Sequence, residues 1–223
     1  MNCHACNSKY STTTKPFGLA HFKCPNCGHR YRTADNAAEY HATVYTERLN
    51  DREPEQRVHN DLIKIVKPYL IQCKTVLDIG PGLGLFAKRA NQFCEVECVE
   101  VNPKFANVCQ DLGFTTYLSD FMNFSSEKKY DAVTIWATLE HFDDINLLME
   151  KMKSLSNRFV MFEIPTEDNS DYYIRRFFKK EFRGHHHNFT AKSIEYYINK
   201  HNLNSRLIRK GARQKCTLIV SEK

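Results

Sequence analysis

Short apolar runs alternate with helical patterns of apolar and polar residues along the middle of the chain. The runs at residues 75–80, 96–101 and 130–136 are mostly apolar and are expected to form strands. Residues 84–93 and 103–113 lie between these runs and carry apolar side chains at helical spacing. Strands and helices that alternate in this way predict an α/β fold, in which helices cover both faces of a parallel sheet and a ligand binds at the carboxyl ends of the strands.

The pattern also predicts elements on either side of this unit. Residues 51–72 are expected to form a helix that leads into the main domain. Thr190 is a good N-cap for a helix over residues 191–202, which carries an apolar stripe. Residues 205–211 and 214–223 are expected to form a closing β-hairpin.

Near the N-terminus, two CxxC pairs are separated by seventeen residues. The four cysteines are Cys3, Cys6, Cys24 and Cys27. Two such pairs, joined by a short hairpin, can place four thiolates around one tetrahedral ion, and Pro25 and Gly28 suit the second turn. The spacing predicts a closed structural zinc site over residues 1–30, with a source of stability separate from that of the main domain. Unrelated free thiols and a redox CxxC are the alternatives.

Size and composition bound the fold class. The chain has 223 residues, of which 42% are apolar, enough for one main domain and a small appendage. The sequence contains no apolar stretch of the roughly 20 residues that a membrane span needs, and its first residues lack the apolar core of a signal peptide. These features predict a soluble, cytoplasmic protein.

Charge is distributed unevenly. The net charge is +6, yet residues 175–223 hold thirteen Lys or Arg against three Glu. This surplus is either a solvated face or a preference for an anionic substrate such as a nucleotide-sugar, a phosphorylated glycan or a nucleic acid.

The glycine-rich segment VLDIGPGLG follows the first predicted strand of the main domain. Its glycines, Gly80, Gly82 and Gly84, allow a sharp turn and a close approach of the backbone to a ligand. The dinucleotide fingerprint requires Gly or Ala where this chain has Leu85. Asp78 is an odd neighbour for a pyrophosphate but suits a cationic ligand such as S-adenosylmethionine. Glu100 ends the second strand, where a carboxylate can bind ribose hydroxyls.

Together with Asp120 and the segment YDAVTIWATLEHF, these motifs resemble, in the same order, those of class I S-adenosylmethionine-dependent methyltransferases. The resemblance covers residues 58–223 and implies a Rossmann-like sheet of seven strands that ends with the hairpin. It also implies cofactor contacts: the methionine moiety with the glycine loop, ribose with Glu100, adenine with Asp120 and Phe121, and the cofactor's length with Trp136. The residues so assigned are Asp78, Gly80, Gly82, Gly84, Glu100, Asp120, Phe121 and Trp136. Taken singly, Asp120 also suits a turn and Trp136 a core position.

The predicted organisation is therefore a zinc-ribbon-like module over residues 1–30, a connector over 31–57 and a methyltransferase domain over 58–223.

Glu140 and His141 follow the predicted strand at residues 130–136 and either cap the loop or face the acceptor. A histidine there can take a proton from a hydroxyl near neutral pH. Quinone-biosynthetic relatives have a similar Glu-His and a further carboxylate that is thought to help bind magnesium. This chain has Ala137 at that further position.

A second candidate base lies in the segment GHHHNFT. His185, Phe189 and Thr190 are similar to a motif of methyltransferases that include sugar methyltransferases with a cysteine zinc module. In the members that methylate carbon, a Glu precedes this histidine; here the residue is Gly184, which favours transfer to oxygen. His186 and His187 are expected at the surface or at the rim of the substrate site, and residues 163–184 are expected to form a lid over the acceptor.

The leading hypothesis is O-methylation of a saccharide or nucleotide-sugar, with S-adenosylmethionine as cofactor and a structural Zn²⁺. Methylation of RNA is the first alternative, although residues 1–30, with four basic and no acidic residues, lack a basic-aromatic platform. A different small-molecule acceptor and a non-catalytic adaptor are the others. The sequence does not indicate the oligomeric state.

Overall fold

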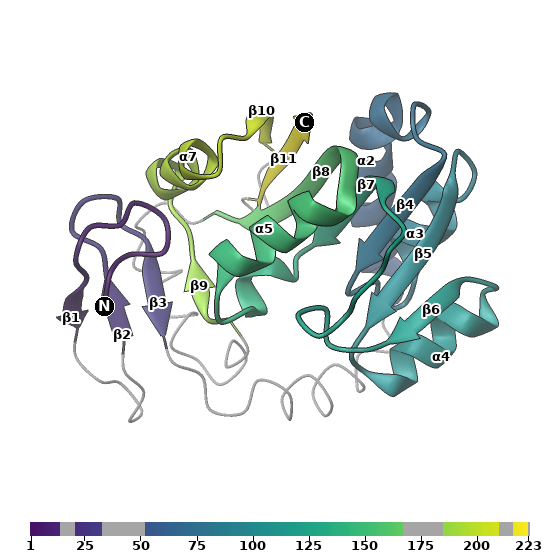
Figure 1. Ribbon diagram of the computed structural model, residues 1–223, viewed down its shortest axis with the longest axis horizontal. Coiled ribbons are helices and arrows are strands. Elements are labelled where there is room, and N and C mark those ends of the chain that lie inside the picture. Colours follow the sequence, from purple (N-terminus) through teal and green to yellow (C-terminus); the bar gives the residue numbers. More distant parts are fainter. Residues whose placement is uncertain (14–20, 33–51, 167–184, 210–215, 223) are drawn as a thin grey trace.

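A seven-stranded sheet forms the larger part of the computed structural model, which describes residues 1–13, 21–32, 52–166, 185–209 and 216–222 (Figure 1). Its strands run in the order β10-β11-β8-β7-β4-β5-β6. Their bounds are β4 Thr75–Ile79, β5 Glu95–Glu100, β6 Thr115–Leu118, β7 Tyr130–Trp136, β8 Ser156–Pro165, β10 Asn204–Arg209 and β11 Cys216–Glu222. Strands β4 to β8 pair in parallel, whereas β11 is antiparallel to both β8 and β10. The predicted α/β fold and its closing hairpin are confirmed.

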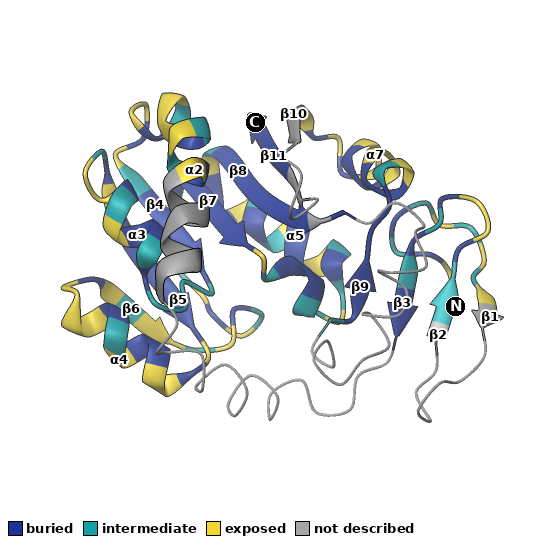
Figure 2. Ribbon diagram, turned by 180° about the vertical axis from the view of Figure 1, so that it is seen from behind, coloured by how far each residue is buried: buried dark blue, intermediate teal, exposed yellow. Residues whose placement is uncertain are grey.

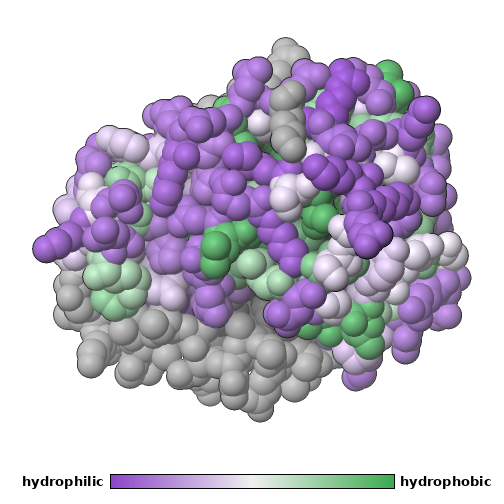
Figure 3. Space-filling view, viewed as in Figure 1, coloured by the Kyte–Doolittle hydropathy of each residue, from purple (hydrophilic) through white to green (hydrophobic). Residues whose placement is uncertain are grey.

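Helices cover both faces of this sheet. The helical elements are α2 Arg52–Leu70, α3 Leu85–Ala90, α4 Pro103–Asp111, the 3₁₀ turn η3 Leu139–His141, α5 Ile145–Leu155 and α7 Ala191–Lys200. Helix α5 covers the face seen in Figure 1, and α2 and α3 cover the face seen in Figure 2. The predicted helices over residues 51–72 and 191–202 are confirmed to within two residues at each end. None of the described helices is long and apolar enough to span a membrane, and the face in Figure 3 is mostly hydrophilic.

The period of two along each strand divides the interior into two cores. In β4, Val76 packs with residues of α2 and α3, whereas Leu77 packs with residues of α5 and α7. The same division holds in β7, where Ala132 and Trp136 join the first core and Val133 the second. The two faces of one sheet therefore support different parts of the molecule.

A small antiparallel sheet lies beside the second core. It consists of β1 Ser11–Thr13, β2 His21–Lys23, β3 Arg30–Arg32 and β9 His187–Asn188, in that order. Three of these strands come from the N-terminal segment, but β9 comes from the segment that enters α7, and Figure 1 shows it beside β3. Tyr31 and Arg32, which were expected in the connector, therefore form a strand.

The N-terminal sheet shares its core with the main domain. Buried Cys3, Ala5, Cys24 and Cys27 belong to the same hydrophobic cluster as the side chains of α5 and α7. The packing differs from the expected separate source of stability, because residues from both ends of the chain exclude water from one core.

Thr190 joins the two parts at the start of α7, and its replacement tests this junction. Its Oγ1 accepts a hydrogen bond from the Ser193 backbone N at 3.1 Å and donates one to the Cys27 carbonyl at 2.6 Å. Thr190→Val preserves the shape of the side chain but removes both bonds, so we expect the free energy of unfolding to fall by about 2 kcal/mol.

Urea denaturation measures this change. Thr115→Val, at an exposed position on the edge strand β6, is the control and should stay within about 0.5 kcal/mol of wild type. Equal stability of the two variants would show that the junction contributes nothing.

Candidate active site

The loop after β4 leaves space at the carboxyl end of the sheet. Gly80 and Gly82 have positive φ angles of 64° and 54°. A Cβ on Gly80 would lie 2.8 Å from Thr138 Cγ2, so only glycine lets the loops after β4 and β7 approach so closely. A Cβ on Gly82 would meet no described atom within 4 Å, and this open space is where a ligand can contact the backbone. Gly84 is the N-cap of α3.

Asp78 and Glu100 are buried carboxylates at the ends of β4 and β5. Asp78 Oδ1 accepts a hydrogen bond from Thr134 Oγ1 at 2.7 Å, whereas its Oδ2 has no partner among the described residues. Burial raises the pKa of Asp78 to about 7. Glu100 accepts hydrogen bonds from the backbone N of Asn102 at 2.9 Å and of Gly82 at 3.2 Å, and burial raises its pKa. A cationic ligand would stabilise both carboxylates in their charged form.

Trp136 supplies a further polar atom to this region. Its Nε1 is buried without a partner among the described residues, and its ring centroid lies 4.8 Å from that of Phe86. Unpaired buried donors and acceptors are costly, so Asp78 Oδ2 and Trp136 Nε1 fit a polar ligand such as S-adenosylmethionine, which has an ammonium group, a carboxylate and ribose hydroxyls.

Asp120 and Phe121, the residues assigned to adenine, lie in a turn and in the core. Asp120 is exposed and accepts a hydrogen bond from the Met122 backbone N at 2.8 Å, the geometry of a turn. The Phe121 side chain is buried in the second core. The cofactor roles of Asp120, Phe121 and Trp136 remain predictions.

Glu140, His141 and His185 lie close together at the loop after β7. One side-chain nitrogen or oxygen from each lies within 4.8 Å of those of the others. The rings of His141 and His185 are 4.5 Å apart and nearly perpendicular. The sequence predicts His141 and His185 as two separate candidate bases, whereas in the structure their rings are in contact.

Glu140 is the buried member of this group. Its Oε2 has no partner among the described residues, and burial, with a smaller effect of the Glu163 carboxylate, raises its pKa to about 8. At neutral pH it therefore carries a proton and can donate a hydrogen bond. The half-buried imidazoles of His141 and His185 can accept a proton, and the same three groups are close enough to bind a divalent cation.

The expectation for His186 and His187 is wrong. Their exposed fractions are only 3% and 2%. His186 Nδ1 lies 2.6 Å from Asp143 Oδ1, and His187 Nδ1 lies 3.3 Å from His29 Nε2. A strand of two residues has too short a pattern to reveal from sequence which sheet it joins. The expected lid falls almost entirely on residues outside the described ones, as does Gly184.

The four cysteines have the geometry of a zinc site. Their sulfur atoms lie within 4.8 Å of one another, with Cys3 and Cys27 Sγ 3.6 Å apart and Cys6 and Cys24 Sγ 3.4 Å apart. Tetrahedral zinc with Zn–S distances of about 2.3 Å requires sulfur separations of about 3.8 Å.

The turns around the cysteines support the same assignment. The backbone N of Asn7 donates to the Cys3 carbonyl and that of Gly28 to the Cys24 carbonyl, both at 2.9 Å, and both donors have positive φ. Two matching turns around four thiols fit a structural Zn²⁺, which would hold residues of both pairs together.

Comparisons with known proteins agree with this geometry. A model of the methyltransferase domain family matches residues 45–207, whereas no curated protein matches the sequence significantly. Magnesium protoporphyrin IX methyltransferase from Synechocystis PCC 6803 with bound SAH is similar in structure, with a TM-score of 0.68 and 12% identity over 83% of this chain and 97% of that chain.

Two other similar structures extend the comparison. The N-methyltransferase NodS from Bradyrhizobium japonicum WM9 in complex with S-adenosyl-L-homocysteine has a TM-score of 0.61 and 16% identity over 84% of this chain and 96% of that chain. The methyltransferase domain of bacterial CtHen1-CN has a TM-score of 0.59 and 16% identity over 76% of this chain and 99% of that chain. At these identities the likeness establishes the fold.

Replacement of Glu100 tests the cofactor site. Glu100→Ala removes a carboxylate that can accept hydrogen bonds from ribose, so we expect S-adenosylmethionine binding to weaken by about 1.5 to 3 kcal/mol in calorimetry. Glu95→Ala is the control, because Glu95 is exposed at the other end of the same strand. Tight binding of NAD, or unchanged affinity in Glu100→Ala, would contradict the assignment.

Proposed function

The chain is an S-adenosylmethionine-dependent methyltransferase of the methyltransferase domain family, and we propose that its acceptor is a hydroxyl group of a saccharide or nucleotide-sugar. The observation that carries this proposal is the contact between His141 and His185 beside Glu140. A hydroxyl must lose its proton as it is methylated, and a neutral imidazole accepts that proton near neutral pH.

S-adenosylmethionine, when bound, supplies a methyl group on a cationic sulfur. We propose that the chain's residues orient the acceptor oxygen toward that carbon and accept its proton. A C–O bond forms as the C–S bond breaks, the sulfur keeps the electron pair of the broken bond, and the hydroxyl proton passes to His141 or His185. Proximity and alignment supply most of the rate, and the base supplies the remainder.

Glu140 has a separate role in this proposal. Because burial raises its pKa to about 8, it is protonated at neutral pH and can donate a hydrogen bond to a neighbouring imidazole or to the acceptor oxygen. The basic surplus of residues 175–223 supports an acceptor that carries negative charge, such as a nucleotide-sugar.

Two observations are also compatible with an amine or RNA as the acceptor. NodS is an N-methyltransferase, and an imidazole base can equally take a proton from an amine. The basic residues that favour a nucleotide-sugar would also favour RNA. Mass spectrometry of labelled methyl groups, after incubation with separate pools of nucleotide-sugars, amines and RNA, distinguishes these acceptors, and labelling confined to amines or RNA would overturn the hydroxyl-sugar proposal.

Replacement of each histidine tests the base. His185→Ala should lower turnover roughly 10²-fold or more, the scale of general-base loss, while S-adenosylmethionine affinity in calorimetry stays close to wild type. His141→Ala is the matched comparison, because the two rings are in contact.

The outcomes assign the base. Loss of turnover in only one variant identifies that histidine as the base. A double variant that retains turnover would show that the enzyme works by positioning alone. If turnover of the wild-type protein requires an added divalent cation while metal analysis shows that the four-cysteine site keeps its zinc, the three groups bind a metal ion instead.

A further inference from the structure

Residues 185–187 lie between the N-terminal sheet and the loop that carries His141. The backbone N of Arg32 in β3 donates to the His186 carbonyl at 3.0 Å, and Arg32 Nε donates to the His185 carbonyl at 2.6 Å. On the other side, the backbone N of His186 donates to the Glu140 carbonyl at 2.8 Å. The backbone around His185 is therefore fixed from both directions.

Arg32 is unusual for its burial. Only 1% of it is exposed, and it is the largest fully buried side chain among the described residues. Burying a guanidinium costs more free energy than burying an apolar side chain of the same size. A planar guanidinium, however, donates hydrogen bonds in fixed directions, which an apolar side chain cannot do. The hydrogen bond from Arg32 Nε therefore fixes the direction of the His185 carbonyl.

A chain of rings makes a second connection to the acceptor side. Tyr10 Oη lies 2.7 Å from His29 Nδ1, His29 Nε2 lies 3.3 Å from His187 Nδ1, and His187 Nε2 lies 3.2 Å from the Asp143 carbonyl. One set of tautomers satisfies every contact: Tyr10 donates to His29, His29 to His187, and His187 to the carbonyl. Asp143 comes two residues after His141, so this chain reaches the other histidine of the pair.

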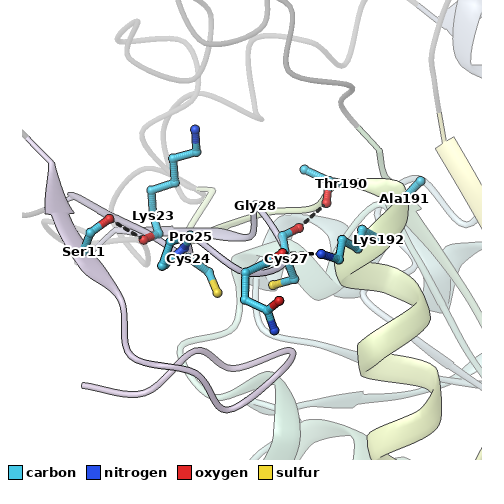
Figure 4. A pocket seen from close by; sticks show the side chains of 10 residues that line it. Ser11, Lys23, Cys24, Pro25, Cys27, Gly28, Thr190, Ala191 and Lys192 are labelled. Atoms are coloured by element: carbon cyan, nitrogen blue, oxygen red, sulfur yellow. Dashed lines mark hydrogen bonds between the residues drawn. The ribbon is translucent and has the colours of Figure 1, made fainter.

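The second cysteine turn is docked on α7 as well. Cys27 accepts a hydrogen bond from Thr190, and Asn26 accepts one from Lys192 Nζ at 2.6 Å, as Figure 4 shows. A Cβ on Gly28 would lie 3.0 Å from Thr190 Cγ2, so the turn and the helix start are in close contact. The turn that carries two of the cysteines therefore holds the end of the same segment that begins at His185.

We propose that the described N-terminal residues 1–13 and 21–32, the four-cysteine module, are a positioning element of the acceptor site. In it, Arg32 holds His185, and His29, through His187, holds the loop that carries His141. The module brings the two imidazoles into contact. What the imidazoles do rests on the proposed function, but their placement by the module can be measured without turnover.

The test uses the full chain and two variants. Arg32→Met keeps an unbranched buried side chain but removes the hydrogen bond to His185, and His29→Phe keeps a ring but removes the bonds to Tyr10 and His187. Lys9→Met is the control, because Lys9 is an exposed cation of the same module. Metal analysis and thermal unfolding of each variant establish that the module is intact.

Two readouts report the placement. In histidine-labelled protein, the nuclear Overhauser effect between the His141 and His185 rings should be strong in wild type and in Lys9→Met, and lost in Arg32→Met. Amide exchange at His186 should rise roughly tenfold or more in Arg32→Met, because its bond to Glu140 opens more often. His29→Phe should weaken the same ring contact, and S-adenosylhomocysteine should bind every variant with similar affinity in calorimetry.

The proposal is overturned if the ring contact and the His186 protection persist in both Arg32→Met and His29→Phe, or if Lys9→Met loses them equally. If Arg32→Met does not fold, the result for His29→Phe decides. Failure of the proposed function gives a different result: turnover survives replacement of both His141 and His185, whatever the ring contact shows.

Discussion

Hydrogen bonds on both sides of residues 185–190 determine where His185 lies relative to His141. This segment pairs with β3 through β9, contacts the loop after β7 through the backbone of His186, and begins α7 at Thr190. It has few residues and no room for an independent core. Its conformation is therefore determined by the two sheets that it joins, and the position of His185 follows from both.

The seven-stranded sheet separates the two chemical tasks. Asp78, Thr134 and Trp136 alternate with residues of the second core and so face α2 and α3. Cys3, Cys24 and Cys27, by contrast, belong to the core on the opposite face, and Cys6 packs against it. The proposed cofactor contacts of Asp78 and Trp136 thus depend on the sheet and its first core, whereas the proposed acceptor contacts of His141 and His185 depend on the second core and the N-terminal module. This division predicts that the placement of His141 and His185 can change without a change in cofactor binding.

Much of the fold could be predicted from the sequence, because the strands and helices between residues 75 and 113 each show the period of their own element. The CxxC spacing predicted the four-cysteine cluster, and Thr190 predicted the start of α7. The placement of β9, Arg32 and His187 could not be predicted, because each depends on pairing between segments about 150 residues apart. For the same reason, His141 and His185 could be proposed from sequence as alternatives but not as neighbours, and the burial of His186 and His187 was missed.

Amide exchange before and after metal removal tests most directly whether the conformation of residues 185–190 depends on the four-cysteine module. Metal analysis of the reduced full chain should give one zinc ion per chain, since four thiolates complete a single tetrahedral site. After the zinc is removed by a chelator, we expect exchange of residues 185–190 to rise roughly tenfold or more, together with that of residues 21–32, while β4 keeps its protection. If residues 21–32 lose protection and residues 185–190 do not, the module is a separate appendage and the acceptor site does not depend on it.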